Sequence, residues 1–304
     1  MEIYKPDLKI IDLLRKQKFT ISAEVIPPRN GTAQNEIFTQ VSDLIQAGAQ
    51  FLSVTKGAGG SLRAGSLPIA QAIKDHFKVP AIAHFTCRDL TPEEVENQLM
   101  DHHYFGIRNI LGLRGDPPTG VSDWSPKPGS YPYAYQLIEQ IQNLNQGQFL
   151  ERTGFQSQAK TKTEFCIGAA AYPDEKNEKP RIDYFIQKIQ AGAEYGITQM
   201  IYDADSYNRF CDDLAKKGFD IPILPGARIL KSQKQADRMR DKFGIHIPDS
   251  YYSKLPLEEN HEMAIEVFLK FVDKLKSAGA PGLHVFVLVD TQASCEVIKS
   301  LKNN

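Results

Sequence analysis

The sequence has few cysteines, and no two of them form a CxxC pair. The four residues, Cys87, Cys166, Cys211 and Cys295, lie far apart in the chain. Disulfide frameworks and thiolate metal sites both depend on closely spaced cysteines, so the sequence indicates neither. Reduced thiols are the simplest interpretation, and we expect a cytoplasmic protein that uses no metal.

An excess of one charge and long apolar runs are also missing. The 36 lysines and arginines nearly cancel the 37 aspartates and glutamates, which leaves no long-range field to attract nucleic acid or an anionic membrane. No apolar run approaches the roughly 20 residues that span a bilayer. Residues 1–19 mix acids and bases and lack the apolar core of a signal peptide. We therefore expect no nucleic-acid partner and no membrane partner.

The chain alternates apolar, β-rich segments with segments of helical periodicity. Strands are predicted at residues 19–26, 51–55, 81–86, 107–113, 165–171, 197–202, 221–224 and 282–289. Helices are predicted at residues 35–48, 68–77, 133–144, 181–191, 207–217, 232–243 and 259–277, with another after Thr91. Eight strands joined by helical crossovers favour a closed (β/α)8 TIM barrel, an α/β fold. An open sheet is the alternative if one strand is lost.

A weak internal repeat supports this count. The tripeptide Ala-Gly-Ala, centred on Gly48, Gly192 and Gly279, ends three predicted helices and leads each time into a strand. Glycine is favoured where a helix ends in a left-handed residue. We predict one barrel domain over residues 1–304, with an N-terminal helix at about 6–17 and a polar insertion at about 145–163 on the face opposite the functional loops.

The turn after the fourth predicted strand is the first candidate site. Leu113 is followed by Arg114, Gly115, Asp116 and two prolines, which end the strand in a polar turn. In α/β proteins, ligands bind at the carboxyl ends of the strands. Gly115 would let the backbone approach a flat or phosphorylated ligand. An ordinary tight turn with an ion pair between Arg114 and Asp116 is the alternative.

Other polar residues fall at the same ends of the predicted strands. Glu24 lies inside an apolar strand, where burial favours the protonated carboxyl, so it is a candidate proton donor; the alternative is a carboxylate paired with a buried base. His84 has a similar place, and a core histidine is the commoner role. The side-chain amide of Gln199 both donates and accepts hydrogen bonds, so it could bind the edge of an amide-bearing ring. The alternative is a structural role at the mouth of the barrel.

Two basic residues, Arg181 and Lys188, lie seven positions apart on one predicted helix. They would face the same way and could meet phosphates, although a solvated helix face is the usual role of such charges. The strand ends offer no three metal ligands in register. Redox or acid-assisted chemistry on an organic cofactor therefore fits the residues better than metal-dependent hydrolysis.

An ordered series of short motifs carries a family resemblance. The motifs are Ala23-Glu-Val-Ile-Pro-Pro28, Ser53-Val-Thr55, Ala83-His-Phe-Thr-Cys87, Leu113-Arg-Gly-Asp-Pro-Pro118, Ala170-Ala-Tyr-Pro173, Ala191-Gly-Ala193 with Ile197-Thr-Gln199, Pro225-Gly226 and Leu283-His284. Together they resemble the methylenetetrahydrofolate reductase family of flavin-dependent (β/α)8 barrels. The resemblance covers residues 19–286.

The resemblance implies that bound FAD takes hydride from NADH or NADPH. It then reduces 5,10-methylenetetrahydrofolate to 5-methyltetrahydrofolate, in one-carbon metabolism and methionine biosynthesis. Glu24 matches the family's acid and Asp116 a carboxylate near flavin and pterin. The implied FAD contacts are Thr55, His84, Leu113, Arg114, Gly115, Asp116, Tyr133, Ala134, Tyr172, Lys176 and Lys188. The implied folate contacts are Glu24, Asp116, Gln199 and Gln235, with Arg228 as a possible further cation.

The chain also departs from the family pattern. Lys176 stands where many members have a histidine, and Arg181 and Tyr184 replace an aspartate and an asparagine that hold the adenosine part of FAD. In the last strand, Phe286 stands where the family usually has a tyrosine. Four positions later, Asp290 stands where the family usually has an arginine. This exchange of a cation for an acid bears on recognition of the folate tail.

Two other readings stay open. One, prompted by the altered last strand, is a flavin barrel that acts on another small molecule, as in the proline dehydrogenase group. The other is a folate- or flavin-binding subunit that takes electrons from a partner protein. A homo-oligomer is compatible with each reading. We expect the protein to lack the carboxyl-terminal regulatory domain that eukaryotic family members have.

Overall fold

A computed structural model describes most of the chain. It covers residues 4–28, 31–57, 64–118, 120–121, 123–151, 161–174, 178–288 and 290–303, with the backbone alone for residues 178–180. The centre of the predicted polar insertion, residues 152–160, lies outside the described residues, as does Lys176.

Eight parallel strands close into a barrel, which confirms the predicted fold. The strands are β1 Thr20–Val25, β2 Phe51–Val54, β3 Ala81–Thr86, β4 Asn109–Leu113, β5 Cys166–Ala171, β6 Tyr195–Met200, β7 Ile223–Ala227 and β8 Gly282–Phe286. Each strand pairs with the next, and β8 pairs with β1 from Thr20 opposite Gly282 to Glu24 opposite Phe286. This last pairing excludes the open sheet.

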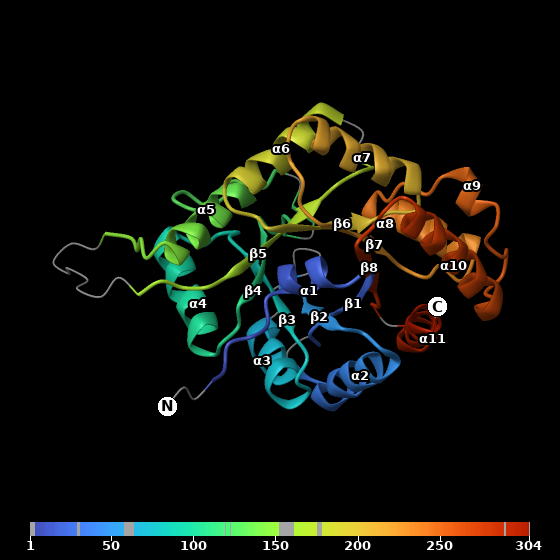
Figure 1. The fold of residues 1–304 in the computed structure, drawn as a ribbon, viewed down its shortest axis with the longest axis horizontal. Coiled ribbons are helices and arrows are strands. Elements are labelled where there is room, and N and C mark those ends of the chain that lie inside the picture. Colours follow the sequence, from blue (N-terminus) through green and yellow to red (C-terminus); the bar gives the residue numbers. More distant parts are fainter. Residues whose placement is uncertain are drawn as a thin grey trace.

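Helices surround the barrel, as Figure 1 shows. They are α1 Ile10–Lys16, α2 Gln34–Ala47, α3 Ser66–His76, α4 Pro92–Tyr104, α5 Ala134–Asn145, α6 Glu178–Gln190, α7 Ala204–Lys216, α8 Gln233–Phe243, α9 Asp249–Tyr252, α10 His261–Ser277 and α11 Thr291–Lys302. Two of these, α9 and α11, were not among the predicted elements. The last strand ends at Phe286, three residues before the predicted end, because α11 follows soon after it.

Local sequence signals explain several helix boundaries. Thr91 caps α4 in a capping box with Glu94, as its sequence indicates. The three repeated glycines have positive φ angles of 120° at Gly48, 121° at Gly192 and 79° at Gly279. A side chain is strained in that region, so glycine is the residue that lets each helix turn directly into the next strand.

The amino-terminal end of the barrel is closed by α1, which lies over its centre in Figure 1. Ile10, Ile11 and Leu14 of α1 are buried against inward-facing apolar side chains from the strands, including Phe51, Ile82, Leu111, Tyr195 and Leu224. Asn109 of β4 ties the segment down: its Oδ1 accepts from the Ile10 N–H, and its Nδ2 donates to the Leu8 carbonyl. Apolar side chains fill the amino-terminal end of the barrel, so the polar side chains inside the barrel lie toward its carboxyl end.

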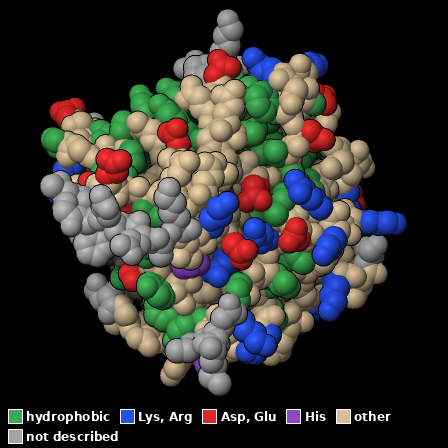
Figure 2. Space-filling model, turned by 60° about the vertical axis from the view of Figure 1, so that its left-hand side comes forward, with side chains coloured by type: hydrophobic (Ala, Val, Ile, Leu, Met, Phe, Trp, Pro, Cys, Tyr) green, Lys and Arg blue, Asp and Glu red, His purple; other side chains and the backbone are tan. Residues whose placement is uncertain are grey.

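The surface carries charges of both signs. On the face drawn in Figure 2, acidic and basic side chains are interspersed among hydrophobic and uncharged ones. Among the described residues, no helix is both long and apolar enough to cross a membrane.

Candidate active site

Four neighbouring strands place a polar cluster inside the barrel. Side chains alternate between the two faces of a strand, so Ser22 and Glu24 on β1 point into the barrel together with Ser53, His84 and His284 on its neighbours. Oε2 of Glu24 lies 3.5 Å from Nε2 of His84 and 4.0 Å from Nε2 of His284. Glu24 is only 8% exposed. The structure thus combines both readings of Glu24, a buried carboxyl and a neighbour of buried bases.

Two serine hydroxyls contact the ring of His284. Ser22 Oγ donates to the Leu283 carbonyl at 3.3 Å and lies 2.8 Å from Nδ1 of His284. Ser53 Oγ lies 3.2 Å from Nε2 of His284. Each ring nitrogen therefore has a hydroxyl neighbour, and Nε2 also faces Glu24.

His84 is a neutral base at physiological pH. Burial lowers its pKa from 6.5 to about 4; Glu24 opposes this shift, and His284 adds to it. Nε2 of His84 has no hydrogen-bond partner among the described residues. Glu24 therefore has a neutral imidazole beside it on the His84 side.

The turn after β4 has the backbone shape expected of it. Gly115 has φ +93°, and a Cβ there would lie 2.9 Å from Cβ of Arg88. Arg88 also donates from Nη1 to the Asp116 carbonyl. The alternative ion pair between Arg114 and Asp116 is not formed; Nε of Arg114 donates to the Gly115 carbonyl. Both predicted charges, on Arg114 and Asp116, are exposed at this rim.

The end of β2 contributes a second candidate contact. Thr55 is buried, and its Oγ1 has no partner among the described residues. The next residue, Lys56, extends away to Gln98 of α4, with 2.9 Å between Nζ and Oε1. Burial lowers the pKa of Lys56 to about 8. The hydroxyl of Thr55 is thus available to a ligand, whereas the ammonium of Lys56 is hydrogen-bonded to Gln98 of α4.

The beginning of α5 and the middle of α6 carry aromatic rings, of which Tyr133 and Tyr184 are exposed. Tyr133 stacks on Tyr135 at 5.5 Å between centroids and on Tyr184 at 6.0 Å. Ala134 begins α5 beside them. Nearby in the chain, Tyr172 is exposed, and Lys188 Nζ lies 5.3 Å from its ring. These rings offer a flat surface of the kind on which a nucleotide base stacks.

The two basic residues of α6 do not share a role. Lys188 donates from Nζ to the Ala170 carbonyl at 2.8 Å, at the end of β5. Arg181 is buried and donates to the Pro173 carbonyl, so it supports the turn after β5. The solvated helix face considered for Arg181 is therefore wrong.

The expected folate contacts are only partly assembled. Gln199 is exposed at the end of β6. Gln235 lies in the first turn of α8, where its Oε1 accepts from the Lys231 N–H at 2.7 Å. Arg228 is 9% exposed, and its Nη1 lies 3.9 Å from the Met239 sulfur on α8. Gln235 and Arg228 therefore make their contacts around α8, apart from the Glu24 cluster.

Sequence reasoning gave no role to Ser22, Ser53, His284 or Lys231. The first three could have been found from their alternation with Glu24 and from the expected pairing of β8 with β1. Lys231 follows β7 in a loop, and no periodic signal predicts where its side chain points. Among the described residues, no group of three or more His, Cys, Asp or Glu side chains is arranged to hold a metal.

Comparison with known proteins decides the family. The model of the methylenetetrahydrofolate reductase family matches residues 9–302. The chain belongs to the methylenetetrahydrofolate reductase family. The match covers all eight strands and the Glu24 cluster inside the barrel.

Relatives within the methylenetetrahydrofolate reductase family differ in length. The chain is 28% identical to the 5,10-methylenetetrahydrofolate reductase of Escherichia coli over 294 residues, covering 93% of this chain and 91% of that protein. It is 29% identical to methylenetetrahydrofolate reductase 1 of Schizosaccharomyces pombe over 296 residues, covering 94% of this chain and 46% of that protein. The chain thus spans about half the length of the fungal and plant relatives it matches.

A solved structure shares the fold of this reductase-family chain. It is an uncharacterized protein from Clostridium thermocellum that binds two copies of 5-methyl-5,6,7,8-tetrahydrofolic acid. Its TM-score is 0.61 at 18% identity, and the match covers 97% of this chain and 99% of that one. At this identity the likeness supports the fold alone.

Proposed function

We propose that the protein reduces 5,10-methylenetetrahydrofolate to 5-methyltetrahydrofolate with NADH or NADPH as electron donor and FAD as cofactor. The observation that carries this proposal is the position of Glu24 between His84 and His284, inside the mouth of a barrel of this family. A buried carboxyl beside a neutral base, here His84, is suited to general acid catalysis. The reaction consumes one proton with each hydride.

The residues present fit FAD. Gly115 leaves room at the turn after β4 that a Cβ would fill, and Thr55 Oγ1 is a buried hydroxyl without a partner among the described residues. Tyr133 and Tyr184 offer a stacking surface, and Lys188 a positive charge. Bound FAD would supply the redox chemistry, taking hydride from the nicotinamide and giving it to the methylene carbon of the folate.

The chain's own residues would handle the proton and the pterin. Glu24 would donate a proton to the folate nitrogen that leaves the methylene carbon, which opens the five-membered ring. His84 and His284 would keep the Glu24 carboxyl in place, and the neutral His84 would spare it a permanent ion pair on that side. Asp116, exposed at the rim, would hold the pterin, with Gln199 as a further contact.

Rapid mixing under anaerobic conditions tests the proposal. The purified protein should carry flavin absorbance that NADH or NADPH bleaches and that 5,10-methylenetetrahydrofolate restores. Bleaching without restoration by folate would favour a flavin barrel for another small molecule. If neither nicotinamide bleaches the flavin, but folate reoxidises flavin that has been reduced chemically with dithionite, the result would favour a subunit that takes its electrons from a partner protein.

A further inference from the structure

Two consecutive residues just beyond β3 contact the backbone of the turn after β4. The Cys87 N–H donates to the Leu113 carbonyl at 3.1 Å, and Sγ of Cys87 lies 3.8 Å from the Arg114 carbonyl. The next residue, Arg88, donates from Nη1 to the Asp116 carbonyl. Three carbonyls of this segment are therefore held from the end of β3.

The position of Asp116 depends on Arg88. The residue before it, Gly115, has a φ of +93°, in the region that glycine adopts freely. The two residues after it, Pro117 and Pro118, have no backbone N–H to donate. Among the described residues, Asp116 makes no hydrogen bond other than the one from Arg88. Without that bond, the turn would be free to move about Gly115.

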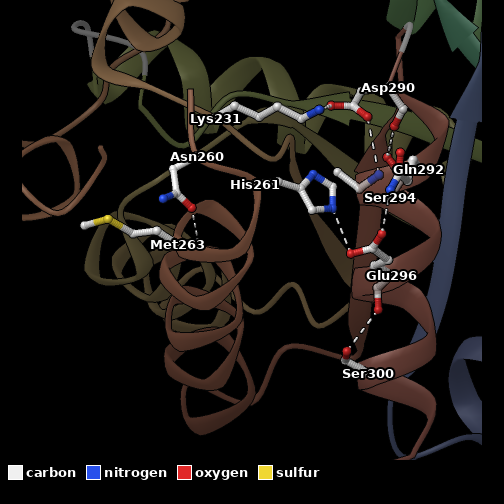
Figure 3. A network of polar contacts seen from close by, with 10 residues as sticks. Lys231, Asn260, His261, Met263, Asp290, Gln292, Ser294, Glu296 and Ser300 are labelled. Atoms are coloured by element: carbon white, nitrogen blue, oxygen red, sulfur yellow. Dashed lines mark hydrogen bonds and ion pairs between the residues drawn. The ribbon is translucent and has the colours of Figure 1, made fainter. Parts of the chain in front are cut away.

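Arg88 contacts the backbone of Asp116 and not its carboxylate. Nε of Arg88 instead lies 3.5 Å from Oδ2 of Asp89. Figure 3 shows a different arrangement on the rim after β7 and β8, where Lys231 extends to the carboxylate of Asp290 at 2.6 Å. The carboxylate of Asp290 is thus taken by a cation, whereas that of Asp116 forms no ion pair with a described residue.

We propose that Arg88 is a positioning residue of the flavin site, which fixes the turn through the Asp116 carbonyl and leaves the Asp116 carboxylate free for the substrate. This inference rests on the proposed function, in which Gly115 lies against FAD and Asp116 holds the pterin. The Arg88 side chain is only 12% exposed, and its guanidinium makes a charge-assisted hydrogen bond. A ligand that meets a turn already in shape loses less free energy to ordering it.

The first test measures the dissociation constant of FAD by quenching of flavin fluorescence. Arg88→Ala keeps the Cβ beside Gly115 and removes the guanidinium. We expect the dissociation constant to rise about tenfold, and Arg88→Lys to lose less because it keeps a charged donor. Millimolar guanidinium ion should restore tight binding to Arg88→Ala and leave the wild-type protein unchanged. A loss of packing alone would not be reversed in this way.

The fluorescence of Trp124 tests the same turn without flavin. Trp124 is the only tryptophan in the sequence, and its ring lies 5.7 Å from the guanidinium of Arg114. Release of the turn should separate these two groups and expose the indole. The emission of Trp124 in flavin-free Arg88→Ala should therefore move to longer wavelength, and added guanidinium ion should move it back.

Two control variants separate the contacts of Arg88. Arg209→Ala makes the same substitution on α7, where the side chain is 59% exposed and pairs with Asp203 at 3.7 Å, so FAD binding and Trp124 emission should not change. Asp89→Asn removes the ion pair with Arg88 but leaves the bond to the Asp116 carbonyl. Asparagine tolerates the positive φ of 60° at this position, so this variant should bind FAD nearly as tightly as the wild-type protein.

Three results would overturn the inference while leaving the proposed function intact. The first is unchanged FAD binding and Trp124 emission in Arg88→Ala. The second is an equal loss of affinity in Asp89→Asn, which would place the role of Arg88 in its ion pair. The third is a loss in Arg88→Ala that guanidinium ion does not reverse. If the wild-type protein binds no FAD, the proposed function fails instead, and Trp124 emission still shows whether Arg88 holds the turn.

Discussion

Nε2 of His84 lies 3.5 Å from Oε2 of Glu24, and both side chains are buried inside the barrel. The imidazole is neutral because burial lowers its pKa to about 4. The carboxyl therefore meets an uncharged neighbour that can accept a hydrogen bond from its protonated form. This relationship makes Glu24 the first residue to test.

Glu24→Gln should retain flavin and its bleaching by NADH but lose folate-dependent reoxidation by a factor of about 100 or more, the usual contribution of a general acid. Glutamine keeps the shape and can donate hydrogen bonds, but it cannot release a proton to the folate. The two half-reactions are measured separately by stopped-flow absorbance. Glu96→Gln, a buried glutamate on α4, is the control and should leave both rates unchanged. Normal reoxidation in Glu24→Gln would remove Glu24 from its role.

Gly115→Ala should weaken flavin binding. Its Cβ would lie 2.9 Å from Cβ of Arg88 and 3.3 Å from Cβ of Thr86, so the turn after β4 must shift. We expect the dissociation constant of FAD, measured by quenching of flavin fluorescence, to rise about tenfold, a cost of about 1.4 kcal/mol.

Gly120→Ala is the matched control for that turn. Gly120 has a similar positive φ of +83°, but a Cβ there meets nothing within 4 Å. Gly120→Ala should therefore strain the backbone in the same way but displace no neighbouring atoms, and it should bind flavin normally. Equal losses in both variants would mean that strain alone, and not the close approach at Gly115, weakens binding.

Stability should depend on pH through two buried histidines. Burial lowers the pKa of His84 and of His102 to about 4, below the value of 6.5 of an exposed imidazole. The unfolded chain therefore binds these protons first as the pH falls. Their contribution to stability is complete above pH 6.5 and is lost as the pH falls from about 6.5 to 4, by about 3 kcal/mol for each histidine.

His102→Gln should accordingly show a shallower loss of stability in acid, measured by urea unfolding at pH 7.5, 5.5 and 4.5. Asp7 acts in the opposite direction, because burial raises its pKa to about 7 and its contribution is lost as the pH rises from about 4 to 7. The informative quantity is thus the difference between wild type and variant. An identical slope in the two proteins would contradict the assignment to His102.

Leu14→Ala should destabilise the fold by about 2–4 kcal/mol, since it opens a cavity where α1 closes the barrel. Leu13→Ala, at a partly buried neighbour, should cost clearly less. Urea unfolding gives both values. Folate turnover at a temperature where both variants are folded should be unchanged, because α1 lies at the end opposite Glu24. A selective loss of turnover in Leu14→Ala would contradict this separation.

The barrel could be predicted because each strand-helix unit has its own sequence pattern: a β-rich apolar strand, a helix of regular apolar spacing and, in three units, a glycine at the helix end. Strand β3 was predicted with its observed bounds, and the glycines at the helix ends have the conformations that their positions indicated. The start of β6 was missed because it depends on packing across the barrel. Tyr195 fills the space beside Gly168, where a Cβ would lie 2.5 Å from its ring. Neither residue reveals the other in the sequence.

The last helix, α11, shows a different kind of failure. Ala293, Val297, Ile298 and Leu301 have helical spacing and are buried, so the signal was present but was not used. The placement of Glu24 and His84 close together inside the barrel could be predicted because both residues lie on strands. Side chains beyond the strand ends, such as Arg228 and Lys231, take directions set by loop conformation, which periodicity does not encode.

Closure of one end of the barrel by α1 has a practical use. Because α1 lies near the amino terminus, a chain attached to a surface or to a carrier through that terminus would be held by the end opposite Glu24. The other end, with Glu24 and the turn at Gly115, would then face the solution. Immobilised protein oriented in this way should keep its mouth open to the proposed substrates.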